Sequence, residues 1–160
     1  MVIWFAVLAL IGVALVFDSA NLDYRLVMAG ALLPALEGFL GHPWVAHTLV
    51  APVAVMALIM LVARGKRLVQ RRWLGVPIGM FAHLVLDGTW ANTQVFWWPF
   101  AGWGKLGEAQ VPEFSRGTTG WVFEALALLL AGWAWQRFGL GDPAKRQDLW
   151  KNGRLSGLSR

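Results

Sequence analysis

Residues Met1–Phe17, MVIWFAVLALIGVALVF, contain no charged side chain, and the first acidic residue after them is Asp18. A helix needs about 17–25 mainly apolar residues to cross the hydrocarbon core of a bilayer. No basic segment comes before this stretch and no small-residue cleavage pattern comes before Asp18, which argues against a signal peptide. We therefore predict a retained transmembrane helix here.

The rest of the chain supports the same fold class. Residues AVILMFWYC make up 58% of the chain beside 18 glycines, charged residues make up 14%, and mean hydropathy is +0.54. Typical soluble domains contain about 45–50% apolar residues with glycine included, and 11 tryptophans suit the headgroup region of a bilayer. We predict an all-α integral membrane protein with about five transmembrane helices in one domain, residues 1–138, with spans at 1–17, 26–40, 48–63, 73–86 and 120–138.

The charges predict an orientation. Of the 14 Lys and Arg residues, all but Lys105 and Arg116 fall on one side of these spans. The positive-inside rule then places the N-terminus outside and the C-terminus inside a bacterial inner (cytoplasmic) membrane. Residues 139–160 become a basic, loosely ordered cytoplasmic tail. Because the net charge of +5 is an orientation signal in this interpretation, we expect no nucleic-acid partner.

Five polar side chains fall toward the outer ends of their spans: Glu37, His42, His47, His83 and Asp87. His83 and Asp87 are four residues apart and share one face of a helix. Imidazole and carboxylate ligands suit zinc, iron or manganese, and the chain has no cysteine that would supply a thiolate. The residues also allow a structural role: interfacial histidines bonded to backbone or water, a turn after the helix at Asp87, and a solvated Glu37.

Four segments occur in an order that resembles one family. They are LLPALE at 32–37, HPWVAHT at 42–48, GMFAHLVLD at 79–87 and WWPF at 97–100. Together they resemble the bacterial membrane-bound metal-dependent hydrolases, the family that includes the LexA-binding inner-membrane-associated hydrolases. The resemblance covers about residues 29–103.

The resemblance implies a divalent metal ion, by similarity to zinc-dependent phospholipase-C-like enzymes. It also implies hydrolysis of an ester or phosphoester, a lipid among the candidates, at the outer face of the membrane. His47, His83 and Asp87 would be the metal ligands, and Glu37 or His42 a further ligand or the general base. Membrane lipids, a lipid-like substrate and a membrane protein are the expected partners.

Two other functions stay open. Ala35 stands where the family has its first aspartate, which favours a catalytically degenerate scaffold or accessory subunit of a membrane complex. A small transporter is a third alternative, against which the lack of an inverted repeat argues. Glu124 is either an acceptor behind a ligating histidine or a group bonded to another helix, and Gly75 to Gly79 predicts close helix packing.

Overall fold

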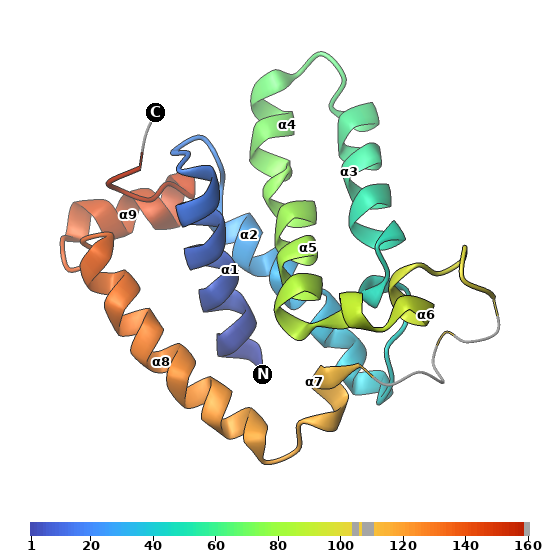
Figure 1. Cartoon of the computed structure of the whole chain (residues 1–160). Helices are drawn as coiled ribbons and strands as arrows, with labels where there is room; N and C mark the ends of the chain where they lie inside the picture. The colour runs from blue at the N-terminus through green and yellow to red at the C-terminus, as the bar shows by residue number, and fades with distance from the viewer. Residues whose placement is uncertain (104–105, 107–110, 159–160) are drawn as a thin grey trace.

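The computed structural model describes residues 1–103, 106 and 111–158, without the side chains of residues 38, 39, 113 and 114. Lys105 lies outside the described residues. The described residues fold mainly into helices (Figure 1). In chain order these are α1 (Val2–Phe17), α2 (Tyr24–Leu32), η1 (Pro34–Leu40), η2 (Val45–His47), α3 (Val50–Val62), α4 (Arg67–Trp73), α5 (Gly75–Asp87), η3 (Thr89–Ala91), α6 (Thr93–Phe96), α7 (Pro112–Ser115), α8 (Thr119–Arg137) and α9 (Pro143–Asn152), where η marks a 3-10 segment.

Three of the predicted spans contain shorter helices than expected, whereas 1–17 and 120–138 correspond to the continuous helices α1 and α8. The stretch 26–40 divides into α2, which has 9 residues, and the 3-10 segment η1 that begins at Pro34. The stretches 48–63 and 73–86 contain α3 and α5, each of 13 residues. Thirteen helical residues rise about 20 Å, whereas the hydrocarbon core is about 30 Å thick.

Within the described ranges, no helix combines the length and the apolar character that crossing a membrane requires. α8 has 19 residues, but Glu124, Gln136 and Arg137 lower its hydropathy. The predictions of an integral membrane protein with five spans, of an outside N-terminus and inside C-terminus, and of an inner-membrane location are therefore wrong.

The closest helix pair in the fold is α2 with α5, which run in the same direction in a four-residue register (Figure 1). A Cβ atom on Gly75 would lie 2.8 Å from the carbonyl oxygen of Asp23, and one on Gly79 would lie 2.0 Å from that of Val27. A Cβ on Gly30 would likewise lie 2.1 Å from the Val76 carbonyl oxygen. Only glycine permits backbones to approach this closely, so the predicted close packing at Gly75 and Gly79 is present.

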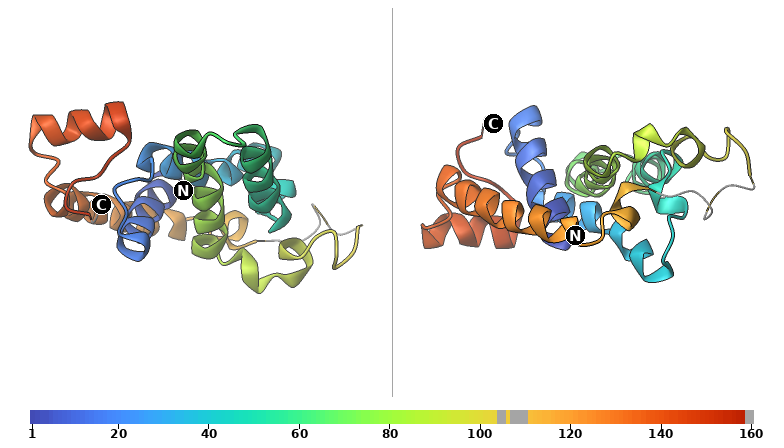
Figure 2. Two further views of the ribbon diagram at one scale, coloured as in Figure 1. Left: turned by 90° about the horizontal axis from the view of Figure 1, so that it is seen from above. Right: turned by 60° about the horizontal axis from the view of Figure 1, so that its bottom comes forward.

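The other helices pack around this pair. α1 contacts α2, α5 and α8, and α8 runs along the edge of the molecule beside α1 (Figure 1). α9 folds back at the end of α8 (Figure 2), and Leu140, Leu149 and Leu155 join the core that contains Tyr24 and Phe138. Part of the segment that we expected to be a loose tail is therefore packed against the helices.

The glycine contact makes a direct prediction about stability. Gly79→Ala should lower the free energy of unfolding by about 1–3 kcal/mol, because the new methyl group meets backbone atoms that cannot move independently. Urea unfolding followed by circular dichroism measures this. Gly132→Ala on α8 is the control, since nothing lies within 4 Å of its Cβ position, and it should leave stability unchanged or raise it by up to about 1 kcal/mol. Equal effects of the two substitutions would contradict the close-contact explanation.

Candidate functional site

A cluster of polar side chains is buried where η2 meets the last turns of α5. His47, His83 and Asp87 are each 0% exposed, as is Thr89 just after α5. The rings of His47 and His83 have centroids 5.3 Å apart and lie nearly perpendicular. Burying a polar group costs free energy unless the group is hydrogen-bonded. The hydrogen-bond partners of each side chain therefore show which of its atoms are already engaged.

Glu37 and His47 form a tight pair. The Nδ1 atom of His47 lies 2.7 Å from Oε2 of Glu37, and the backbone N–H groups of Trp44 and Ala46 donate to the same carboxylate at 2.7 Å each. Burial alone raises the pKa of Glu37, but the hydrogen bonds from His47, Ala46 and Trp44 outweigh it and hold the pKa below its ordinary value of 4.5. The carboxylate is therefore ionised at neutral pH and fixes the proton of His47 on Nδ1.

The backbone of α2 orients His83. Nδ1 of His83 lies 2.8 Å from the carbonyl oxygen of Ala31, and because a carbonyl only accepts, His83 also carries a proton on Nδ1. The Phe5 ring of α1 packs over the imidazole with centroids 3.9 Å apart. With Nδ1 carrying a proton in both rings, Nε2 is the ring nitrogen that is left for acid–base chemistry or metal coordination.

Asp87 is held by two residues that the sequence did not mark. The hydroxyl of Thr89 donates to Oδ2 at 2.9 Å, and Nη2 of Arg116 lies 3.6 Å from Oδ1. The same Nη2 donates to the backbone oxygen of Asp87 at 3.0 Å. The positive charge of Arg116 beside Asp87 competes with any cation for the carboxylate oxygens.

The structure corrects the metal-binding prediction. Across the described part of the chain, no group of three or more His, Asp or Glu side chains is placed to hold a metal ion. The physical reason lies in the partners: Glu37 binds His47 and two backbone donors, and Arg116 faces the carboxylate of Asp87. The general prediction of a metal-binding protein is therefore wrong for the residues described. The choice of zinc, iron or manganese and the assignment of His47, His83 and Asp87 as its ligands stay predictions.

Two other predicted residues lie elsewhere. His42 is half-buried; its ring packs on Trp44 with centroids 5.7 Å apart and its Nδ1 lies 3.3 Å from the Pro43 carbonyl oxygen. No hydrogen bond or ring contact within the described residues joins it to His47 or His83. Glu124 accepts the backbone N–H of Trp4 at 3.1 Å, so it caps the first turn of α1. Of the alternatives for Glu124, a bond to another helix is the one present.

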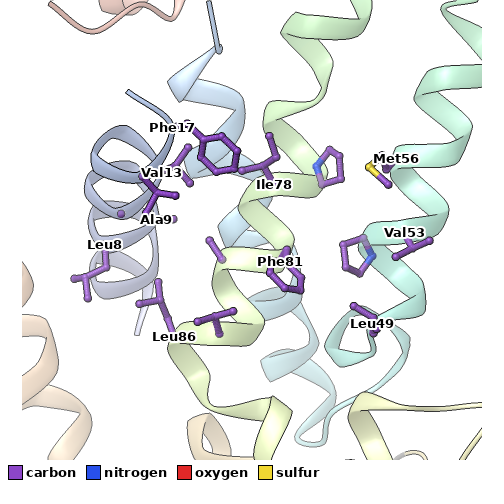
Figure 3. Close-up of a pocket in the computed structure, with 16 residues that line it drawn as sticks. Leu8, Ala9, Val13, Phe17, Leu49, Val53, Met56, Ile78, Phe81 and Leu86 are labelled. Carbon is purple, nitrogen blue, oxygen red and sulfur yellow. The ribbon is translucent and has the colours of Figure 1, made fainter. Parts of the chain in front are cut away.

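An apolar cavity of about 540 Å³ lies between α1, α3 and α5. Figure 3 shows its lining side chains, with Ile78, Phe81 and Leu86 on the central helix. At 3.6 residues per turn, Ile78 and Phe81 fall on the face of α5 roughly opposite His83, whereas Leu86 lies nearer to it. The side chains that line the cavity do not include His47, His83 or Asp87.

Sequence reasoning found Glu37, His47, His83 and Asp87 but missed the groups that orient them. Arg116 lies 29 residues beyond Asp87 in the chain, and no local pattern connects the two. The acceptor for His83 is a backbone carbonyl, which every residue has. One signal was available: Gly75, Gly79, His83 and Asp87 follow each other at intervals of four, which places the polar pair on the packed face of the helix.

Comparisons of the chain with protein-family models, with curated proteins and with solved structures find no match. The resemblance to membrane-bound metal-dependent hydrolases therefore stays a prediction, and the cluster has to be interpreted from its own geometry.

The Glu37–His47 pair predicts how stability depends on pH. The pKa of Glu37 is lower in the folded chain than its ordinary value of 4.5. The stabilisation is therefore complete above that value and is lost as the pH falls through the folded pKa. Wild type should exceed Glu37→Gln by about 1.5–3 kcal/mol near neutral pH, the range for a charge-assisted hydrogen bond. This difference should shrink once the pH falls below the ordinary value.

Urea unfolding of both proteins at about pH 7 and about pH 3.5 measures the difference. Asp148→Asn on α9 is the control for removal of a carboxylate. Asp148 accepts a hydrogen bond from Asn152 on its own helix and is not part of the Glu37–His47 pair. The pKa of Asp23 is also lowered in the folded chain, so its protonation in acid destabilises wild type and variants alike. This loss of stability therefore cancels from the difference between them. A Glu37→Gln difference that stayed constant over this range would contradict an ionised pair.

Proposed function

We propose that this chain is a hydrolase that cleaves an ester or phosphoester by acid–base catalysis with His47 and His83. The observation that carries the proposal is the Glu37–His47 pair at 2.7 Å, with a second imidazole whose ring centroid lies 5.3 Å away. An ionised carboxylate behind Nδ1 of a histidine fixes the tautomer and stabilises the imidazolium that forms when Nε2 accepts a proton. This is the arrangement that a general base requires.

The two imidazoles then take different parts in the reaction. Nε2 of His47 accepts a proton from water while the water oxygen attacks the carbonyl carbon or the phosphorus. Protonated His83 donates its Nε2 proton to the leaving oxygen, so the ester bond breaks to give an acid and an alcohol. The hydrogen bond from Nδ1 of His83 to Ala31 keeps the ring in place through both protonation states, because Nδ1 carries a proton in each.

The substrate's apolar part is not assigned to the large cavity. The side chains that line that cavity do not include His47 or His83, and two of them, Ile78 and Phe81, lie on the face of α5 roughly opposite His83 (Figure 3). A lipid-like substrate stays a prediction, and short synthetic esters and phosphodiesters are the suitable first probes.

A second candidate function, an accessory subunit of a protein complex, is favoured by exposed apolar side chains. On α3 these include Leu61 and Val62, and on α8 Trp121 and Leu129, each at least 70% exposed. Large exposed apolar patches mark contacts with other molecules. This function does not require the ionised Glu37–His47 pair, so activity measurements separate the two.

Hydrolysis of p-nitrophenyl butyrate and of bis(p-nitrophenyl) phosphate tests the proposal. His47→Asn and His83→Asn should each lower kcat/KM by about 100-fold or more, the contribution of a general acid or base. Asparagine is chosen because its amide N–H can replace Nδ1–H and keep the bond to Glu37 or Ala31. Asp148→Asn on α9 should keep wild-type activity.

Two results would overturn this assignment. Unchanged activity in both histidine variants, with their folds intact by circular dichroism, would leave the accessory-subunit function as the better one. Activity that a chelator abolishes and zinc restores would replace the acid–base mechanism with a metal-dependent one.

A further inference from the structure

A second polar centre lies at the other end of the α2–α5 pair, about 18 Å along α5 from Asp87. Asp23, just before α2, is only 2% exposed. Its carboxylate accepts Nε and Nη2 of Arg25 at 3.0 and 2.7 Å and Nε of Arg72 at 3.1 Å. The negative charge of Asp23 is therefore already matched by two guanidinium groups.

This centre also fixes the end of α9. The backbone N–H of Tyr24 donates to the carbonyl oxygen of Gly153 at 2.8 Å, and Arg25 donates to the carbonyl oxygen of Trp150. Gly153 has φ of +72°, and a Cβ there would lie 1.9 Å from Oδ1 of Asp23. The residues on either side of Gly153, Asn152 and Arg154, are consequently held beside α2 and α4.

A cavity of about 250 Å³ lies at this junction. Its polar lining consists of three guanidinium side chains, two carboxamide side chains and the ion-paired carboxylate: Arg71, Arg72, Arg154, Asn21, Asn152 and Asp23. Since one water occupies about 30 Å³ of liquid, the space holds a phosphate group with a small substituent.

The charges in the cavity are unbalanced. Arg72 pairs with Asp23, but the described residues provide no ion pair for Arg71 or Arg154. Both side chains are exposed enough to rotate toward a ligand. Guanidinium groups bind phosphate oxygens through two parallel hydrogen bonds, and the two carboxamides add further donors.

We propose that this cavity binds the phosphate group of a phosphomonoester, with Arg71 and Arg154 as the principal contacts. The Asp23–Arg25–Arg72 cluster positions the cavity by joining α2, α4 and the end of α9. The phosphate is either that of a small soluble phosphomonoester or that of a lipid whose headgroup is itself a phosphomonoester, as in phosphatidic acid, since both present the same group. This site is independent of the histidine cluster and of the hydrolase proposal.

Isothermal titration calorimetry of the full chain with inorganic phosphate and with glycerol 3-phosphate tests binding of the soluble form. Co-sedimentation with phosphatidylcholine vesicles that contain phosphatidic acid, against pure phosphatidylcholine, tests the headgroup form. Arg71→Gln and Arg154→Gln should each weaken binding by about tenfold, and the double variant more. Arg67→Gln is the matched control: it removes one positive charge from the same helix, α4, at a position outside the cavity lining, and should change binding less than twofold.

Binding in either arm that follows this pattern supports the proposal and identifies the source of the phosphate. No binding in both arms would overturn it, as would an equal loss in Arg67→Gln, which would indicate a general charge effect. If the double variant fails to fold by circular dichroism, the single variants decide, because neither arginine side chain has a hydrogen bond or ion pair to another described residue.

Discussion

The close contact between α2 and α5 is the constraint on which the rest of the structure depends. Gly75 and Gly79 on α5 and Gly30 on α2 bring the two backbones so near that any Cβ at these positions would overlap a carbonyl oxygen. Because the contact repeats at intervals of four residues on both helices, it fixes their register as well as their separation. The next position along the same ridge of α5 is His83, where Nδ1 meets the carbonyl oxygen of Ala31. The packing of the helices and the orientation of a candidate catalytic group therefore have the same cause.

The same contact determines both polar centres. At the start of α5, Gly75 packs against the backbone of Asp23. The carboxylate of Asp23 accepts hydrogen bonds from Arg25 and Arg72. At its end, α5 presents His83 and Asp87, and His47 comes from the η2 segment with Glu37 behind it. A change in the α2–α5 register would displace His83 from its acceptor and would also disturb the junction with α9. The two centres use different chemistry, yet both need the helix pair to be rigid.

The sequence predicted that residues 1–17, 48–63, 73–86 and 120–138 contain helices, and it predicted part of the site. The reasons for the failures are physical. Composition measures how apolar a chain is, but crossing a bilayer also requires uninterrupted helix length. The 3-10 segment from Pro34 interrupts the stretch 26–40, and α3 and α5 have only 13 residues each. The pairing of Glu37 with His47 was not predicted, because it depends on how η1 and η2 fold back on each other. His83 and Asp87 were correctly placed on one face, since four-residue spacing is a local property of a helix. The role of Arg116 could not be predicted, because it depends on a contact between distant segments.

The buried cluster is costly for stability, and that cost favours a functional explanation. Replacing buried charged and polar groups with well-packed apolar ones is often neutral or stabilising, and the buried Phe5 ring already packs on His83. Instead, the chain places two imidazoles and an aspartate there with no exposed surface. It also uses two backbone N–H groups and a histidine to keep Glu37 ionised. Natural proteins break such packing rules at functional sites, and the two buried imidazoles are the groups to which the proposed acid–base role is assigned.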